Sequence, residues 1–475
     1  MQSLASSGRR RPTATLLLLV VLLLGCAPGP VRPQLPERLA PGTVVYGVVP
    51  PLFGDDPLRD VAARLDALQE LGADVLLLTP VNTTDDCGGI SYSITDYFGV
   101  RPDFGGLEAL RTLVRQAHHR GLRVMLDFVP NHTAAAHPFY VDLQEKGAAS
   151  AYFDFYDRDA SGRVSHYFDW VGLPNLNWDN PQVAAYMTAA FEYWIRAADI
   201  DGFRVDVAWG IRERSPQVWP ALIHRLRRID PDTVMVAEAG ARDPYYIENG
   251  FDLAYDWTEA PGQWAWQAAF ENPGRAGRLL HEAISATRES PHRVLRFLNN
   301  NDTGQRFISR YGADMTRVAA VLLHTVPGVP LVYTGDEVGA EYEPYDDPPP
   351  IAWDDRHGLR HLYRRLAVLR EALPALHSGQ CISLPPPDSP SVYAFIRAVD
   401  HRNWVLVMLN FGPPAQVTVD LPVPYAHWVA ATALVDLLGG EPVRPVENTP
   451  GRLRITLDGS SAKLLAPATP ERRAP

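Results

Sequence analysis

The sequence predicts an α/β protein in which a parallel (β/α)8 TIM barrel is followed by an antiparallel β domain. Apolar, β-branched segments alternate with amphipathic ones from Val44 onward, which is the pattern of βα units. Polar residues directly follow several of these segments, at the place where barrel strands open to solvent. Beyond residue 376 the pattern changes to alternating strands with Pro and Gly turns. The 475 residues suffice for a barrel of roughly 250–400 residues and a smaller domain.

Residues 1–25 have the features of an export signal. Arg9, Arg10 and Arg11 form a positive segment, and nine consecutive Leu or Val residues follow at 16–24. This run is shorter than the ~20 residues of a membrane-spanning helix, so a transmembrane anchor is the weaker alternative. LLGC at 23–26 resembles the lipobox of bacterial lipoproteins, which implies that Cys26 becomes the lipidated first residue of the mature chain. Plain secretion stays open, since Leu24 is unusual in a lipobox.

Residues 26–42 then form a Pro-rich linker, stiff enough to hold a folded body away from a membrane. We therefore expect a bacterial lipoprotein at the cell surface or in the periplasm. Its partner there is the membrane itself, contacted through the N-terminal lipid anchor.

Eight segments have the composition of buried parallel strands. They lie at residues 43–49, 74–79, 122–128, 202–206, 232–238, 252–255, 293–298 and 329–333. Amphipathic stretches lie between most of them, such as 61–71, where apolar residues recur at helical spacing. The sequence therefore predicts a catalytic barrel over residues 43–376.

The connection between the third and fourth strands is far longer than one crossover helix requires. Its first part, 132–178, is rich in Tyr, Phe, Asp and Gly and predicts a small inserted subdomain, and 181–198 predicts the helix that returns to the barrel. Residues 377–467 contain alternating segments at 391–399, 403–411 and 452–457, which predict a C-terminal antiparallel β-sandwich. Residues 468–475 form a tail.

Charge and cysteine content exclude some classes of function. A net charge of −11 without a basic stripe argues against nucleic acid as a partner and suits an uncharged substrate. Only Cys87 and Cys381 follow Cys26, and neither lies in a CxxC or Cys/His pattern. We predict that both are packing residues.

Carboxylates follow three predicted strands: Asp206 in GFRVD, Glu238 in VMVAE and Asp302 in VLRFLNNND. Arg204 and Asp206 are two residues apart and point to the same face of their strand, where the guanidinium would keep the carboxylate ionised. Burial at a strand end would raise the pKa of Glu238 and retain its proton. Two carboxyls in contrasting environments suit glycoside cleavage. The alternative is that each carboxylate is a solvated charge at a strand end. The recurrence of the same feature at three strand ends weakens that alternative.

Four motifs in order along the chain resemble the signatures of the α-amylase family, glycoside hydrolase family 13. They are DFVPNH at 127–132, GFRVDVAW at 202–209, AEA at 237–239 and FLNNND at 297–302. The resemblance extends from Val44 to about Leu465. It implies a retaining glycoside hydrolase that cleaves α-glucosidic bonds in α-glucans or maltooligosaccharides, like α-amylases, neopullulanases or cyclomaltodextrinases.

The resemblance also implies roles for single residues. Asp206 would attack the anomeric carbon, Glu238 would protonate the departing oxygen, and Asp302 would bind the hydroxyls of the distorted sugar. Water would then release a covalent glycosyl-enzyme with retention, for which we expect the carboxyls of Asp206 and Glu238 ~5–5.5 Å apart. The residues expected to bind or position the sugar are Tyr92, Asp127, His132, Arg204, Trp209 and Asn301.

The chain departs from the family pattern at two positions. Asn301 stands where the family usually has His, and an amide cannot carry positive charge, so transition-state binding is expected to be weaker. Many α-amylases bind calcium through the residue matching Asn131 and a His at the position of Gly210. Losing that ligand lowers the affinity for calcium, so we expect no cofactor and no metal, with calcium possible but not favoured. The segment 157–162 resembles the start of a calcium loop but lacks its closing Glu, which predicts a hairpin turn.

Two alternatives to hydrolysis stay open. A transglycosylase of the same family would share every catalytic residue, and a non-catalytic carbohydrate-binding protein on the same barrel would be expected to lack one essential carboxylate. Aromatic residues that could line sugar subsites are Trp209, Trp170, Tyr342, Tyr345 and Trp353.

Overall fold

The computed structural model describes residues 38–468, apart from 87–88, 259, 286–290, 385–387, 432, 444, 446 and 450. The predicted signal segment, Cys26, most of the linker, Cys87 and nearly all of the tail lie outside these residues. Within them, no helix combines the length and the apolar character needed to cross a membrane.

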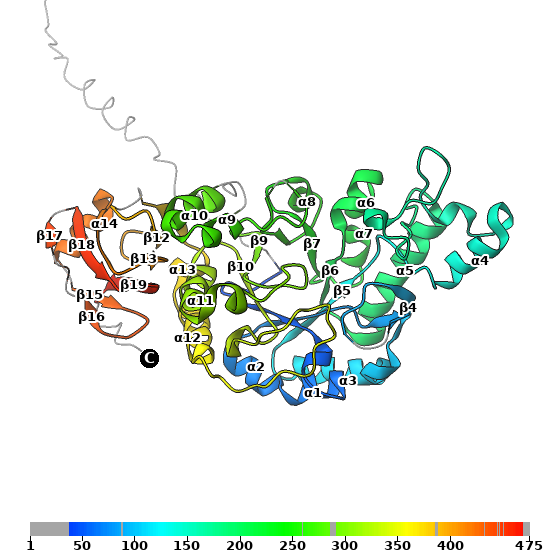
Figure 1. The fold of residues 1–475 in the computed structure, drawn as a ribbon, viewed down its shortest axis with the longest axis horizontal. Helices are drawn as coiled ribbons and strands as arrows, with labels where there is room; N and C mark the ends of the chain where they lie inside the picture. Colours follow the sequence, from blue (N-terminus) through cyan, green and yellow to red (C-terminus); the bar gives the residue numbers. More distant parts are fainter. Residues whose placement is uncertain are drawn as a thin grey trace, which may run out of the picture. The chain divides into compact units, whose positions relative to one another are not determined.

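Eight parallel strands close into a barrel, as predicted. They are β1 (Val45–Val48), β2 (Val75–Leu78), β5 (Arg123–Phe128), β6 (Gly202–Val205), β7 (Val234–Gly240), β8 (Leu253–Tyr255), β9 (Val294–Phe297) and β10 (Val329–Tyr333). Their order around the barrel is β1-β10-β9-β8-β7-β6-β5-β2, so each strand pairs with its neighbours in sequence and β10 closes on β1. All eight predicted segments form these strands, which confirms the predicted barrel (Figure 1).

Helices follow the strands and surround the barrel (Figure 1). They are α1 (Pro57–Ala63), α2 (Leu65–Leu71), α3 (Gly106–His118), α5 (Pro181–Ala198), α6 (Ala208–Arg214), α7 (Val218–Leu226), α8 (Tyr245–Glu248), α9 (Gln267–Glu271), α10 (Ala276–Ser285), α11 (Phe307–Thr325), α12 (Leu359–Ala372) and α13 (Pro374–His377). Helix α5 has the predicted bounds because Asn180 caps its start, accepting a hydrogen bond from the N–H of Gln182 at 2.9 Å, and Pro181 occupies its first turn.

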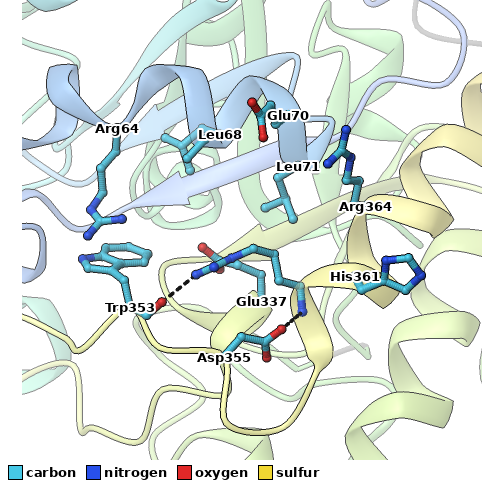
Figure 2. A pocket seen from close by; sticks show the side chains of 11 residues that line it. Arg64, Leu68, Glu70, Leu71, Glu337, Trp353, Asp355, His361 and Arg364 are labelled. Carbon is cyan, nitrogen blue, oxygen red and sulfur yellow. Dashed lines mark hydrogen bonds between the residues drawn. The ribbon is translucent and has the colours of Figure 1, made fainter.

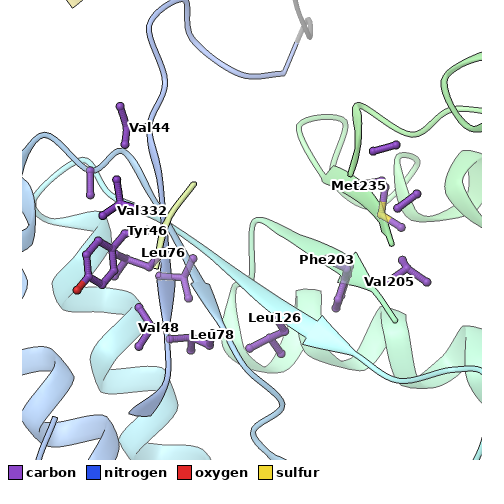
Figure 3. Packing of buried hydrophobic residues seen from close by; sticks show 14 of the residues in the cluster. Val44, Tyr46, Val48, Leu76, Leu78, Leu126, Phe203, Val205, Met235 and Val332 are labelled. Carbon is purple, nitrogen blue, oxygen red and sulfur yellow. The ribbon is translucent and has the colours of Figure 1, made fainter. Parts of the chain in front are cut away.

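Side chains alternate between the inside and the outside of the barrel. On β1, Val45 packs inside, whereas Tyr46 and Val48 face the surrounding helices (Figure 3). On β6, Phe203 and Val205 likewise face outward (Figure 3). Arg204 between them and Asp206 after them therefore point inward. This period of two directs the polar residues at the strand ends toward the barrel axis.

Two additions interrupt the simple barrel. A hairpin of β3 (Asn82–Thr84) and β4 (Ile94–Val100) lies between β2 and α3, and residues 132–178 contain α4 (Pro138–Lys146) and several short turns. The segment 157–162 forms the predicted hairpin turn, with an antiparallel bridge between Arg158 and Val164 around Asp159. A second bridge, between His132 and Asn175, joins the two ends of the insert next to the barrel.

The C-terminal domain has two antiparallel sheets around one core, as predicted. The larger sheet contains β11 (Gln380–Ser383), β12 (Val392–Ala398), β13 (Trp404–Asn410), β15 (Leu434–Asp436), β16 (Pro442–Val443) and β19 (Ser461–Pro467), and the smaller contains β14 (Ala415–Asp420), β17 (Glu447–Thr449) and β18 (Arg452–Leu457), with α14 (Val423–Ala431) after β14. One face of β12 packs against the smaller sheet, whereas Tyr393 and Phe395 on its other face join the core of the barrel domain. The larger sheet therefore contacts α10, α11 and α13 directly (Figure 1).

Candidate active site

Four carboxylates converge on the buried guanidinium of Arg204. Its Nη1 donates to Oδ1 of Asp127 at 2.6 Å and to Oδ1 of Asp206 at 2.9 Å. Its Nη2 lies 3.0 Å from Oε2 of Glu238 and 3.9 Å from Oδ2 of Asp302. The sequence-predicted acidic residues therefore meet at one point, from four separate segments of chain.

The strand period and the barrel register explain this convergence. Asp127 on β5 is paired with Arg204 on β6, and both occupy inward positions at the carboxyl ends of their strands. Glu238 continues the inward series of Val234 and Val236 on β7. Asp302 differs, because it comes from the loop after β9 rather than from a strand.

A left-handed turn directly after Asp206 fixes Glu238. Val207 has a φ of 48°, a conformation that a β-branched residue rarely adopts, and its N–H donates to Oε2 of Glu238 at 2.6 Å. Strained backbone of this kind is often retained where it positions a functional group. Nothing in the sequence signals this contact.

Tyr92 and His132 form one wall of the site. Tyr92 donates its hydroxyl to Oδ2 of Asp127 at 2.7 Å. His132 is fully buried, its Nε2 lies 3.2 Å from the carbonyl oxygen of Tyr92, and its ring stacks on Tyr167 with centroids 5.3 Å apart. Burial lowers the pKa of His132 to about 4, so the ring is neutral at neutral pH.

Asn301, Asp302 and Tyr345 form a triangle of hydrogen bonds. The Nδ2 of Asn301 donates to Oδ1 of Asp302 at 3.1 Å and to the hydroxyl of Tyr345 at 3.0 Å. That hydroxyl in turn donates to Oδ1 of Asp302 at 3.3 Å. The amide at position 301 therefore orients Asp302 together with a tyrosine from the loop after β10.

These side chains surround a cavity of about 460 Å³. Six of the predicted site residues line it: Tyr92, His132, Asp206, Glu238, Asn301 and Asp302. Asp127 and Arg204 lie beneath its floor, in contact with the lining residues. Trp209 does not line this cavity and instead borders an adjacent one of about 360 Å³.

The candidate aromatic residues divide into two groups. Trp170 and Tyr345 line the catalytic cavity, whereas Trp353 and Tyr342 do not. Trp353 packs 4.9 Å from Phe53 and beneath Arg64, bordering a separate cavity of about 430 Å³ between α2 and α12 (Figure 2). The loop after β10 folds back over the barrel helices there, so Trp353 lies away from the cavity that holds Asp206 and Glu238.

Sequence reasoning missed Tyr255, whose hydroxyl accepts from Nε of Arg204 at 3.0 Å. Tyr255 is the last residue of β8 and packs inside the barrel. The same period of two that identified Asp206 would have found it, because it ends a predicted strand at an inward position.

Burial dominates the electrostatics of the two central carboxyls. It raises the pKa of Asp206 to about 7, and the neighbouring Asp127 and Asp302 raise it too, while Arg204 opposes the shift. Burial also raises the pKa of Glu238 well above its ordinary value, again against Arg204. The raised pKa of Glu238 agrees with the expectation that this group retains its proton. The pKa of Asp206 is also raised, so Arg204 does not hold it at its ordinary value, contrary to the expectation from the sequence.

The residues at the family's calcium position do not fit a calcium ion. The Oδ1 of Asn131 accepts a hydrogen bond from Nη2 of Arg214 at 2.7 Å, and Nε of Arg214 lies 2.5 Å from Oδ2 of Asp157. A Cβ at Gly210 would lie 3.2 Å from Asn131 Oδ1 and 3.5 Å from Arg214 Nη1. A guanidinium therefore contacts the oxygens that a cation would need. Elsewhere in the described part of the chain, no three His, Cys, Asp or Glu residues are placed to hold a metal.

The chain is similar to known proteins in sequence and in fold. The family model for the alpha-amylase catalytic domain matches residues 50–357. The alpha-amylase MalA of Haloarcula japonica is 30% identical over 425 residues, which cover 86% of this chain and 60% of that protein. A cyclomaltodextrinase of Geobacillus thermopakistaniensis is 29% identical, covering 82% of this chain and 67% of that protein. The crystal structure of Ttha1563 from Thermus thermophilus aligns with a TM-score of 0.74 at 26% identity, covering 90% of this chain and 99% of that one.

Proposed function

The chain belongs to the α-amylase family, glycoside hydrolase family 13, and from this membership we propose that it is a retaining glycosidase that cleaves α-glucosidic bonds in maltooligosaccharides or α-glucans. The contact of Arg204 with both Asp206 and Glu238 carries the proposal. Both carboxyls open into one cavity, as double displacement at a single anomeric carbon requires. The cyclomaltodextrinase among the relatives supports α-linked glucose as the sugar.

In the first step, Asp206 attacks the anomeric carbon while Glu238 gives its proton to the departing glycosidic oxygen. The bond to the leaving sugar breaks, and an ester bond forms between Asp206 and the remaining sugar. Arg204 holds the attacking carboxylate at 2.9 Å, and the N–H of Val207 holds the acid at 2.6 Å. Both groups are thus oriented before the substrate arrives.

In the second step, the ionised Glu238 takes a proton from water, whose oxygen attacks the same carbon and releases Asp206. Two inversions at one centre give net retention. Asp302 lies at the cavity wall, oriented by Asn301 and Tyr345, where it can accept hydrogen bonds from the sugar hydroxyls. Those bonds would strengthen as positive charge develops on the ring.

The test is product analysis with maltoheptaose, pullulan and isomaltose, with proton NMR of the anomer that forms first. The proposal expects α-anomers, and a rate loss of about 10²–10⁴-fold in Glu238→Gln, since that is the usual contribution of a general acid. Asp206→Asn should be at least as inactive. Asp346→Asn, on the exposed loop after β10, is the matched control. Full activity in either site variant, or β-anomers, would refute the proposal.

The alternative of a non-catalytic carbohydrate-binding protein is disfavoured by one observation. Such a protein has no need for a second carboxyl opposite the first, yet Asp206 and Glu238 both remain and both border the cavity. Binding without turnover in the same product analysis would favour that alternative.

We also propose that the protein is exported and anchored to a membrane through a lipid on Cys26. The proposal is supported by the Arg-rich start, the apolar run at 16–24 and the Gly-Cys pair after it. In bacteria expressing the full chain, incorporation of labelled palmitate is expected in the parent and absent in Cys26→Ser. A Cys26→Ser protein that stays in the membrane fraction would contradict the lipid anchor.

A further inference from the structure

The cavity of about 430 Å³ between α2 and α12 lies among the helices that surround the barrel (Figure 2). It shares no lining residue with the cavity that holds Asp206 and Glu238. Small-molecule sites in proteins have volumes of about 300–1,000 Å³, so this cavity has room for a small organic compound. Leu68 and Leu71 give it an apolar wall, whereas most of its other lining residues are charged.

A buried carboxyl, Glu337, lines the interior of this cavity. Glu337 is 3% exposed and belongs to the short turn η7 (Asp336–Val338) after β10. Tyr46 donates its hydroxyl to the carboxyl, at 3.0 Å from Oε1 and 3.1 Å from Oε2. A carboxylate has about four acceptor sites, so Glu337 can accept further hydrogen bonds from a molecule in the cavity.

Arg64 is a donor without an acceptor at the same cavity. Its guanidinium lies 4.0 Å from the centroid of the Trp353 ring and forms no hydrogen bond or ion pair with another described residue. Partial burial is the main cause that lowers the pKa of Arg64. The indole Nε1 of Trp353 is buried as well and has no partner in the described part of the chain. Polar groups removed from water normally have a partner, so these donors indicate a ligand with acceptor atoms.

A second guanidinium, that of Arg360 on α12, also borders the cavity. Its Nη2 donates to the carbonyl oxygen of Trp353 at 2.7 Å, which leaves its other N–H groups available. The nearby carboxylate of Asp355 is already engaged, because it accepts from the backbone N–H groups of Leu359 at 2.8 Å and Arg360 at 3.1 Å. Within the described residues, neither Arg64 nor Arg360 is paired with a carboxylate.

We propose that this cavity binds a small hydroxylated organic anion, a sugar acid or a sugar phosphate, with its anionic group on Arg64 and Arg360 and its hydroxyls toward Glu337. Guanidiniums bind carboxylates and phosphates through paired hydrogen bonds. The two remaining charged residues at the opening, Glu70 and Arg364, are exposed and of opposite sign, so they leave the positive balance of the site unchanged. This binding site is independent of the proposed hydrolysis.

The experiment is calorimetric titration of the full chain with D-gluconate and with glucose 6-phosphate, which carry the two kinds of anionic group. At least one of them is expected to bind about 10-fold more tightly than both glucose and inorganic phosphate, because only the complete molecule contacts Glu337 and a guanidinium together. Failure of both probes to bind at millimolar concentration would overturn the inference. Equally tight binding of inorganic phosphate would overturn the role of Glu337, and equally tight binding of glucose would overturn the role of the guanidiniums.

Variants locate the bound probe. Arg64→Met and Arg360→Met should each weaken binding about 10-fold, the usual loss for a hydrogen bond to a charged group. Arg59→Met on α1 is the matched control, because Arg59 is exposed and does not line this cavity, and its affinity should equal that of the parent. The fitted dissociation constant does not depend on the fraction of folded protein, which enters only the stoichiometry. Unchanged affinity in both site variants would place the probe elsewhere, the cavity of Asp206 and Glu238 included, and would overturn the inference.

Discussion

Arg214 at the end of α6 donates a hydrogen bond to Asn131 at 2.7 Å and pairs with Asp157 in the inserted segment at 2.5 Å. The guanidinium thereby joins the start of the insert to its middle and to the barrel. Its positive charge lies against the side-chain oxygen of Asn131, whose counterpart binds calcium in many α-amylases according to the family resemblance. The guanidinium of Arg214 thus supplies the positive charge at this junction.

The first prediction concerns metal removal and this cation. A chelator or added Ca²⁺ should leave the melting temperature of the protein unchanged, because Arg214 already satisfies Asn131 and Asp157. Arg214→Met should lower the free energy of unfolding by about 3–5 kcal/mol, the usual cost of leaving a largely buried charge unpaired. The exposed pair of Arg163 and Asp159 gives the control, Arg163→Met, which should leave the free energy of unfolding almost unchanged because water screens this pair.

Thermal unfolding in buffer, with chelator and with Ca²⁺, provides the measurement. A melting temperature of the parent that falls with chelator would contradict the assignment of Arg214. In the Arg214→Met variant, partial recovery by Ca²⁺ would agree with it, because the two oxygens would then be free to bind a cation.

The second prediction is the pH dependence of turnover. Activity needs an ionised Asp206 and a protonated Glu238. The pKa of Asp206 is raised to about 7, so kcat/KM of the free enzyme should fall as the pH drops below about 7. The pKa of Glu238 is raised well above its ordinary value, so the alkaline limb should lie well above pH 4.5.

Rates measured from pH 4 to 10, with melting temperatures at each pH to exclude unfolding, give the profile. An acid limb below pH 5 would contradict the burial argument for Asp206.

The third prediction is that the catalytic carboxylates destabilise the fold. Because the folded-state pKa of Asp206 lies above its ordinary value, the stability from this group is fully present at acidic pH and is lost as pH rises through about 7. Asp206→Asn should therefore raise the free energy of unfolding at pH 8 by about 1–2 kcal/mol, with a smaller gain at pH 5.

Asp66→Asn serves as the control for this prediction. Arg120 lowers the pKa of the fully exposed Asp66, so its removal should have a small effect of opposite sign. Denaturant unfolding of both variants at pH 5 and pH 8 is the measurement. An Asp206→Asn protein less stable than the parent at pH 8 would show that Arg204 compensates the burial of Asp206 fully.

Local patterns in the sequence were sufficient to predict the barrel and its polar strand ends. Strand composition and the period of two depend only on neighbouring residues, so the strands and the inward positions of Asp206 and Glu238 were foreseeable. The left-handed turn at Val207 and the contact of Arg214 with Asn131 were not, because each depends on segments brought together by folding. The packing of Trp353 could not be predicted for the same reason, since its partners Phe53 and Arg64 are about 300 residues away along the chain.

The last prediction concerns the amide at position 301. The Nδ2 of Asn301 orients Asp302 and Tyr345 but adds no charge. Asn301→His should raise kcat roughly 3- to 10-fold at pH 6 without changing the products, because a protonated imidazole donates a charge-assisted hydrogen bond, about twice as strong as a neutral one. The gain should fade as pH rises above the pKa of the new histidine, whereas Asn301→Gln, which keeps a neutral amide, should show none. Tyr345→Phe breaks the triangle from its other side and should lower kcat about 3- to 10-fold, as loss of one net hydrogen bond does. A rate of Asn301→His at or below that of the parent at pH 6 would contradict this prediction. It would mean that the amide holds Asp302 in a geometry that the larger ring cannot reproduce, and that the position of Asp302, rather than the charge at residue 301, limits turnover.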